Sequence, residues 1–142
     1  DRKNFFLTML KQAEKQTPIR VVSDQIVAPT WCPMVANATV LVAHRLLHST
    51  SYEDGVYHMP SGEATSWFGF AEAMFGMPSI HAKFGSVDLA PISTAEYKCA
   101  ATRPPYSLLS GIKLYQLFGI TLPSWREQLA LAAEDIMKRV AP

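Results

Sequence analysis

Cysteine is scarce in this chain of 142 residues, and neither Cys32 nor Cys99 belongs to a Cys-x-x-Cys pair or a Cys/His cluster. Zinc sites need such ligands at fixed spacing. His44 and His48 have the i, i+4 spacing of helical metal ligands, but Arg45 stands where the HExxH zinc motif has its glutamate. We therefore expect no metal site, and we interpret the two histidines as a solvated helix end.

An excess of charge of one sign and long hydrophobic runs are also lacking. The 13 Lys and Arg residues nearly balance the 12 Asp and Glu residues, leaving a net charge of +1, and the basic residues are scattered singly. This pattern gives no electrostatic footprint for nucleic acid. No apolar run approaches the roughly 18 residues of a membrane span. We expect neither a nucleic-acid partner nor a membrane contact.

Sequence motifs for nucleotide binding and nucleophilic catalysis are missing. The chain has no GxGxxG or Walker A loop to hold phosphates, and no GxSxG elbow to present a nucleophile. We therefore assign no catalytic and no cofactor-binding residue to it.

The composition suffices for one folded domain, since 49% of the residues are hydrophobic and 18% are charged. This balance excludes a disordered chain. The sequence begins with Asp1 instead of Met and shows no signal-peptide pattern, which indicates part of a longer protein.

Hydrophobic periodicity predicts more helix than strand. The helix over 33–49 is apolar nearly all round, which predicts that it is buried. Residues 77–107 read as irregular, with a short strand near 84–89 and a helical turn at 94–98. The remaining expected elements are helices over 4–16, 67–75, 110–118 and 123–139 and strands at 19–22 and 56–59.

Two strands of four residues cannot form a sheet of ordinary size. The strand at 56–59 therefore predicts a partner sheet outside this chain. Without that sheet, strand edges and apolar surface would be exposed, and we expect the isolated chain to self-associate.

Two polar segments are binding candidates from their residues alone. Residues 24–30 leave a strand end and enter a turn fixed by Pro29, and binding side chains gather at such positions. In residues 102–107, Pro104 and Pro105 follow Arg103 and preorganise its guanidinium to contact an anionic oxygen such as phosphate. A purely structural loop is the alternative for each segment.

Five segments, in this order and spacing, resemble the dTDP-4-dehydrorhamnose reductases of the extended short-chain dehydrogenase/reductase superfamily. The resemblance runs from Asn4 to about Arg139 and corresponds only to the C-terminal half of such an enzyme. The segments are NFFLTML, RVVSDQIVAPTW, GVYHMPSGEATSWFGFAEAMF, ATRPPYS and FGITLPSWREQL.

The resemblance implies an α/β fold: residues 1–142 form the C-terminal substrate-binding part of a Rossmann-like enzyme, mainly helices with a few short strands. The N-terminal Rossmann domain, with its glycine-rich loop and Tyr-x-x-x-Lys pair, is expected to be absent from this chain. The parent enzyme would be cytoplasmic and would reduce dTDP-4-dehydro-L-rhamnose to dTDP-L-rhamnose for bacterial polysaccharide. Its NADPH or NADH would bind the missing domain, and this chain alone is expected to be inactive and cofactor-free.

The resemblance also implies partners and substrate-binding residues. The partners are a dTDP-sugar, the missing Rossmann half and a second copy in a homo-oligomer. Arg103 is expected near the diphosphate of the sugar nucleotide. Lys15 stands where some members carry the acidic side chains that hold Mg²⁺, so we expect no such metal. The residues implied to bind substrate are Asn4, Phe5, Gln25, Arg103 and Ser107.

The sequence departs from the family pattern near the end of the site. Tyr106 and residues 108–110 replace the usual Asn-Ser-x-Leu-Asp pattern, which leaves the exact substrate open. Two alternatives remain: a non-catalytic binding or regulatory subunit of the same superfamily, and a reductase or epimerase of another nucleotide sugar.

Overall fold

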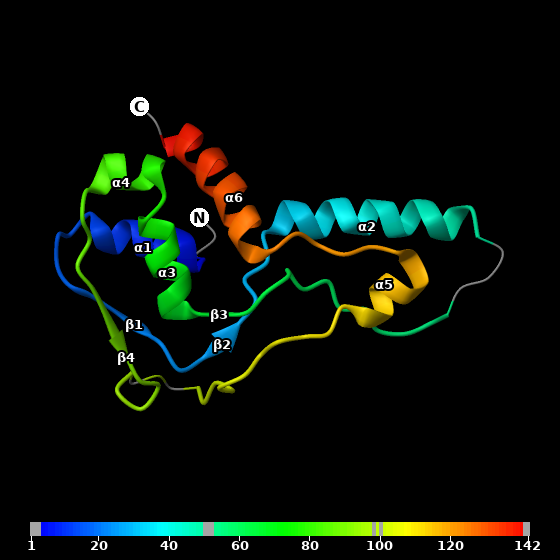
Figure 1. Ribbon diagram of the computed structural model, residues 1–142, viewed down its shortest axis with the longest axis horizontal. Helices are drawn as coiled ribbons and strands as arrows, with labels where there is room; N and C mark the ends of the chain where they lie inside the picture. Colours follow the sequence, from blue (N-terminus) through cyan, green and yellow to red (C-terminus); the bar gives the residue numbers. More distant parts are fainter. Residues whose placement is uncertain (1–3, 50–52, 98, 100, 141–142) are drawn as a thin grey trace.

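The computed structural model describes residues 4–49, 53–97, 99 and 101–140. Figure 1 shows a larger lobe and an arm of two helices that extends from it. The larger lobe contains α1 (Phe5–Ala13), β1 (Ile19–Val22), β2 (Ile26–Val27), β3 (Thr65–Ser66), α3 (Trp67–Phe75), α4 (Pro78–Phe84), β4 (Leu89–Ile92) and α6 (Trp125–Val140). The arm contains α2 (Cys32–Leu47) and α5 (Ile112–Phe118). The expected fold of helices with a few short strands is confirmed.

Short polar side chains decide where two helices of the larger lobe begin. Asn4 precedes α1, and its Oδ1 accepts a hydrogen bond from the backbone N of Leu7 at 2.8 Å. Ser66 precedes α3, and its Oγ accepts from the backbone N of Gly69 at 3.0 Å. Each bond satisfies an N–H that has no partner within its helix.

The strands form two small pairs. β1 and β4 are parallel, with Ile19 opposite Leu89 and Val22 opposite Ile92. β2 and β3 are antiparallel, with Ile26 opposite Ser66. The strand expected near 84–89 lies later in the chain, because α4 occupies residues 78–84. Proline at a first helical position suits such a helix start, which the expectation of an irregular segment missed.

Each lobe has its own apolar core. In the larger lobe, α1, α3, α4 and α6 pack around β1, and Met74, Ile80 and Trp125 are among its most deeply buried side chains. In the arm, Ala38 of α2 meets Leu114 and Phe118 of α5.

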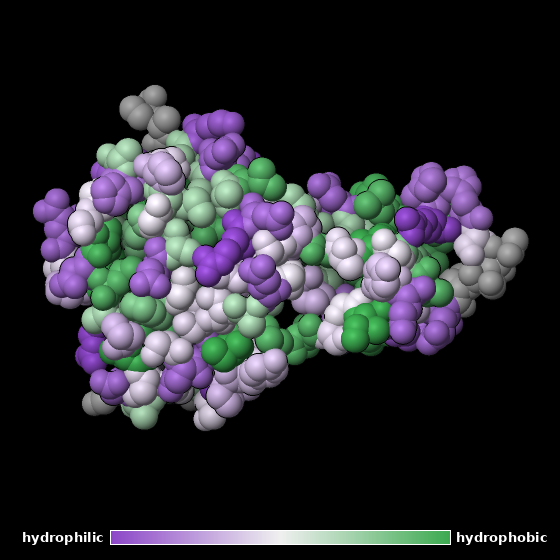
Figure 2. Space-filling view, viewed as in Figure 1, coloured by the Kyte–Doolittle hydropathy of each residue, from purple (hydrophilic) through white to green (hydrophobic). Residues whose placement is uncertain are grey.

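The expected burial of the helix over 33–49 is wrong. Ala38 is its only buried residue in the described part of the chain, whereas Val40, Leu41 and Leu47 are 67%, 55% and 83% exposed. Among the described residues, α2 packs on the core of the arm through one face only, which leaves apolar residues of its other face exposed. Figure 2 shows green hydrophobic surface on this arm among purple hydrophilic residues.

Residues 56–59 do not form a strand within this chain, and the partner sheet expected for them outside it stays a prediction. These residues pair with no strand among the described elements. Tyr57 and Met59 instead pack against the small core of the arm, and the Tyr57 ring meets Phe118 at a centroid distance of 5.4 Å.

A buried glutamine joins the two lobes. Gln128 of α6 is 1% exposed, and its Oε1 accepts a hydrogen bond from the backbone N of Trp31, just before α2, at 2.9 Å. Its Nε2 donates to the carbonyl oxygen of Pro123 at 2.8 Å. The backbone N of Gly62 donates to the same oxygen at 3.0 Å. Gln128 therefore links the segments around residues 31 and 123, and the segment around residue 62 joins them through the Pro123 carbonyl.

Replacing this amide should weaken the fold. Gln128→Met preserves the approximate shape but leaves the Trp31 N–H without its acceptor, while Pro123 O keeps its bond from Gly62. We expect the free energy of unfolding in urea to fall by about 1–3 kcal/mol, the usual cost of an unsatisfied buried group. Gln116→Met, on the exposed surface of α5, is the control and should change it by less than about 0.5 kcal/mol. Equal stabilities of the two variants would contradict this role.

α6 begins with a capping box. The Ser124 backbone N and Oγ donate to Glu127 Oε2 at 2.8 and 2.7 Å, and Glu127 N donates to Ser124 Oγ at 3.3 Å. The bonds from the Ser124 hydroxyl and backbone N–H hold the pKa of Glu127 below its ordinary value of 4.5.

This lowered pKa predicts a contribution to acid sensitivity. A carboxyl whose pKa is lower in the folded state stabilises the fold above its unfolded pKa and loses that contribution as the pH falls through the folded value. Glu127→Gln should therefore flatten the fall of unfolding free energy below about pH 4.5. Identical slopes for wild type and Glu127→Gln would refute the prediction.

Candidate functional site

Backbone pairing around Ile26 brings three distant segments together. On one side Ile26 lies opposite Ser66 in the β2–β3 pair. On the other side it forms a parallel bridge with Tyr106: Ile26 N donates to Pro105 O at 2.8 Å, and Ser107 N donates to Ile26 O at 2.9 Å. We call the aligned residues Ser66, Ile26 and Tyr106 the Ile26 row. It places Gln25, one position before Ile26, next to the segment that contains Ser107.

The segment that carries Arg103 reaches the row through two prolines. Arg103 is exposed, and its side chain forms no ion pair or hydrogen bond with the residues that the structure describes. Ser107 uses its backbone N to bond Ile26 and is itself exposed. Both side chains are thus available to a ligand.

Phe5 approaches the other end of the row. Its ring lies 4.7 Å from the ring of Trp67, which directly follows Ser66, and 5.8 Å from that of Phe70. The Asn4 side-chain oxygen is occupied in capping α1. The NH₂ group of Asn4 remains as a donor toward a ligand.

Gln25 is held by a residue from the far side of the sequence. Its side chain is 5% exposed, and Nε2 donates to Thr94 Oγ1 at 3.1 Å. Thr94 in turn donates to Asp24: its hydroxyl to Oδ1 at 2.6 Å and its backbone N to Oδ1 and Oδ2 at 2.9 and 3.0 Å. The Thr94 hydroxyl, followed by its backbone N–H, lowers the pKa of Asp24 from its ordinary 3.8.

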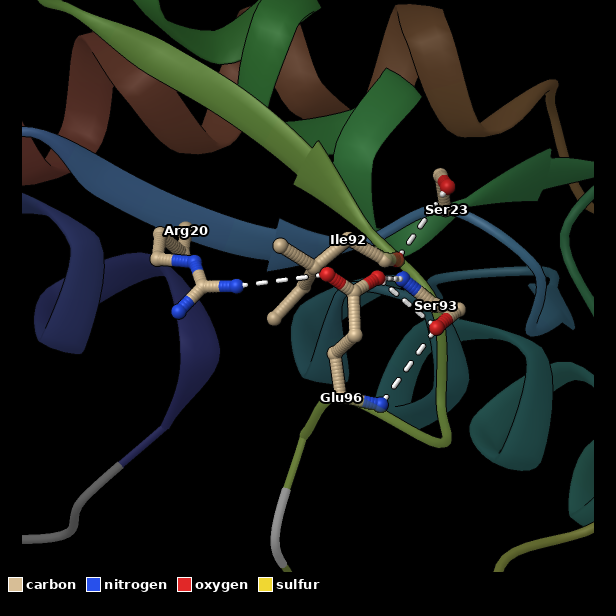
Figure 3. A network of polar contacts seen from close by, with 5 residues as sticks. All are labelled: Arg20, Ser23, Ile92, Ser93 and Glu96. Atoms are coloured by element: carbon tan, nitrogen blue, oxygen red, sulfur yellow. Dashed lines mark hydrogen bonds and ion pairs between the residues drawn. The ribbon is translucent and has the colours of Figure 1, made fainter.

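The turn after β4 is tied to β1 by a second set of polar contacts, shown in Figure 3. Glu96 Oε2 accepts from the backbone N and the Oγ of Ser93, both at 2.8 Å. Glu96 Oε1 contacts Arg20 Nη2 at 3.4 Å, and Ser23 Oγ donates to Ile92 O at 3.2 Å. The Ser93 backbone N–H, then its hydroxyl, lowers the pKa of Glu96. The helical turn expected at 94–98 is observed at 94–96, and residue 98 lies outside the described residues.

This arrangement favours binding over acid–base chemistry. It offers an aromatic ring at Phe5, polar hydrogen-bonding groups at Asn4, Gln25 and Ser107, and the guanidinium of Arg103, which has no partner among the described residues. The nearby carboxylates of Asp24 and Glu96 are already hydrogen-bonded, and these bonds lower the pKa of each. The carboxyl ends of parallel strands are where ligands bind in α/β sheets, and this polar network lies at that end of β1 and β4.

The structure also has hollows away from the row. One of about 550 Å³ lies against α3, α4 and residues 85–89, and one of about 370 Å³ lies between residues 60–62, 109–115 and 120–122. None of the five implied substrate-binding residues lines either hollow. We favour the Ile26 row as the site, because segments that carry residues implied to bind substrate meet there and neither hollow is lined by any of those residues.

Within the described ranges, no group of three or more His, Cys, Asp or Glu residues could hold a metal ion. Among the helices that the structure describes, none combines the length and apolar character of a bilayer-spanning segment.

The five residues implied to bind substrate do not all lie at the row, and the sequence did not point to two residues that support it. Backbone hydrogen bonds of Ile26 bring the segment that follows Gln25 beside the segment that contains Ser107, and Phe5 borders the row. No contact in the described structure joins the side chains of the five implied residues to one another. Sequence reasoning did not select Thr94 or Glu96. The Ser-x-x-Glu spacing from Ser93 to Glu96 is the signal that could have identified this turn, because it matches a capping box.

Comparison with known sequences finds one family over nearly the whole chain. The family model of the RmlD substrate binding domain matches residues 1–138. A dTDP-4-dehydrorhamnose reductase of Burkholderia thailandensis is 39% identical over 96% of this chain and 48% of its own length. One of Aggregatibacter actinomycetemcomitans is 33% identical over 89% of this chain and 43% of its own length. The chain thus spans a little under half the length of these curated relatives.

Solved structures agree with this match. A dTDP-4-dehydrorhamnose reductase of Clostridium acetobutylicum aligns with a TM-score of 0.81 and 26% identity, over 97% of this chain and 45% of the other. One of Bacillus anthracis, in complex with NADP, aligns with a TM-score of 0.67 and 31% identity, over 92% and 42%. With its helix-rich fold, its Ile26 row and a family match over residues 1–138, this chain belongs to the RmlD substrate binding domain family.

Proposed function

We propose that this chain is the sugar-nucleotide-binding part of a reductase that converts dTDP-4-dehydro-L-rhamnose to dTDP-L-rhamnose with NADPH. Family membership and the relatives' names support the reaction, and the NADP in the Bacillus anthracis structure supports the cofactor. The observation that carries the proposal is the Ile26 row. It holds the segments of Gln25 and Ser107, two of the residues implied to bind substrate, side by side although they are far apart in the sequence.

The residues of this chain would bind and orient the sugar nucleotide. Arg103 would contact the diphosphate, because its guanidinium is exposed and unpaired in the described structure and can offer two parallel N–H donors. Phe5, packed on Trp67, would present an apolar surface, and Ser107 and Asn4 would hydrogen-bond the ligand.

The cofactor would be held elsewhere in the whole protein. This sequence has no glycine-rich phosphate loop, so its own residues do not fit NADPH. NADPH would supply the hydride when bound to a Rossmann half.

Binding of a sugar nucleotide tests this proposal. Calorimetric titration of this chain should detect dTDP-L-rhamnose, and Arg103→Ala should weaken its binding by about 1.5–3 kcal/mol, the range for a charge-assisted hydrogen bond. Arg45→Ala, exposed at the end of α2, is the matched control and should bind normally.

Three results would count against it. No binding by the wild-type chain would overturn the substrate-binding role, and an unchanged affinity of Arg103→Ala would remove the diphosphate contact. Tighter binding of a UDP- or GDP-sugar would support the alternative of a reductase or epimerase of another nucleotide sugar, for which the departure at Tyr106 is the specific reason.

The exposed face of α2 suggests where the rest of a whole protein packs. The relatives are about twice as long as this chain, and Val40, Leu41 and Leu47 present an apolar helix face. We infer that a cofactor-binding half covers this face in the whole protein, because exposed contiguous apolar surface marks an interface.

Without that half, the same face should pair with a second copy. Light scattering of this chain should show concentration-dependent self-association, which Val40→Glu with Leu47→Glu should reduce by placing charge on the face. Leu131→Glu, a partly exposed leucine on α6, is the control and should still self-associate. A clean monomer at high concentration, or equal association of both variants, would refute this role for α2.

A further inference from the structure

The hydroxyl of Thr94 lies between the carboxylate of Asp24 and the amide of Gln25, and its bonding leaves one arrangement. A threonine hydroxyl has a single proton to donate. Thr94 Oγ1 lies 2.6 Å from Asp24 Oδ1, and an ionised carboxylate can only accept. The lowered pKa of Asp24 agrees with an ionised group. The hydroxyl proton of Thr94 is therefore committed to Asp24.

This commitment decides which way the Gln25 amide faces. The oxygen and nitrogen of an amide are nearly indistinguishable by shape, so their assignment must come from the hydrogen-bond network. With its proton given to Asp24, Thr94 Oγ1 can only accept from Gln25, and the atom 3.1 Å away must be Nε2. The opposite orientation would set Gln25 Oε1 against a hydroxyl oxygen that has no proton left.

The other end of the amide is open to a donor. Gln25 Oε1 accepts no hydrogen bond from any described residue. Within the described ranges, Ser61 Oγ and Trp125 Nε1 are the side-chain atoms that are both fully enclosed and without a hydrogen-bond partner. Gln25 Oε1 has no partner either but is not one of these enclosed atoms. It is therefore still accessible to solvent or a ligand. Gln25 immediately precedes Ile26, in the segment that runs beside residues 105–107.

We propose that Asp24 and Thr94 are positioning residues that fix the Gln25 amide so that its carbonyl oxygen accepts a hydrogen bond from the bound sugar nucleotide. This rests on the proposed function, since it assigns Gln25 a polarity within that site. The matching ligand group is an O–H or N–H donor, either a sugar hydroxyl or the imide N–H of a thymine base.

We call the hydrogen bonds from Gln25 to Thr94 and from Thr94 to Asp24 the relay. Two variants distinguish a positioning role of this relay from a merely structural turn. Thr94→Val removes the hydroxyl but keeps the backbone N–H that bonds Asp24, and Thr94→Ser restores the hydroxyl. In calorimetric titrations with dTDP-L-rhamnose, we expect Thr94→Val to raise Kd about tenfold, the equivalent of one hydrogen bond, and Thr94→Ser to stay within about twofold of wild type. Thr39→Val, whose hydroxyl bonds only within α2 and to Met59, is the control and should bind normally.

Asp24→Asn is a second variant, in case the first fails to fold. It can still accept from Thr94 N, but its NH₂ can now donate to Thr94 Oγ1 and free the hydroxyl proton, so the Gln25 amide can turn over. We expect a similar rise in Kd in this variant, measured at a temperature where circular dichroism shows that it is folded. In wild type, nuclear Overhauser contacts should join the Gln25 side-chain NH₂ protons to Thr94, and both Asp24→Asn and Thr94→Val should weaken them.

Titration with dTDP alone distinguishes the two donor sources. If the Thr94→Val effect persists with dTDP, the donor belongs to the nucleotide; if it needs dTDP-L-rhamnose, the donor is a sugar hydroxyl, and both results support the relay. A folded Thr94→Val variant with the wild-type Kd for both ligands would overturn the relay while leaving the proposed function intact. Failure of the wild-type chain to bind either ligand would overturn the proposed function. Absence of the NH₂ contacts to Thr94 would overturn the amide orientation independently of binding.

Discussion

The two hydrogen bonds of the buried Gln128 amide are the constraint on which the arrangement of the molecule depends. One end of the amide holds the backbone of Trp31 and the other holds Pro123, and an enclosed amide can satisfy both only in one orientation. Trp31 lies four residues beyond β2 and directly before α2. The same bond therefore fixes the direction in which the arm leaves the larger lobe and the path of the chain out of the Ile26 row. Trp125, the first residue of α6, is buried against Phe70 and anchors that helix in the larger lobe.

The proposed binding site follows from this framework because backbone pairing, not side-chain contact, aligns its segments. Ile26 uses its N–H and C=O to hold residues 105–107, so the side chains of Arg103 and Ser107 are not needed to assemble the site. They remain available to a ligand. By contrast, the carboxylates at the ends of β1 and β4 are occupied in fixing the turn after β4, which keeps Thr94 within reach of Gln25.

The positions of all described helices except α4 could be predicted from the sequence, but which of their faces are buried could not. The caps at Asn4 and Ser66 and the run of 19–22 depend on residues within a few positions, so expected and observed bounds agree closely. The burial of α2 was predicted wrongly because an apolar composition does not say how many neighbours a helix has. A related reason applies to the strand expected at 56–59. Alternation of apolar and polar residues favours a strand, but a strand also needs a partner to share its hydrogen bonds, and no described strand supplies one.

By itself the sequence determined every described helix except α4, the first strand, the motifs of the substrate-binding family and the choice of Gln25, Arg103 and Ser107 as candidates. These depend on local hydrogen bonding, periodicity and motif spacing, all of which can be read along the chain. Only the tertiary structure decided which face of α2 is exposed, that the segments of Gln25 and Ser107 run side by side, and which end of the Gln25 amide is free. The bond from Gln25 to Thr94 spans 69 positions, and a contact between residues so far apart exists only once the chain has folded.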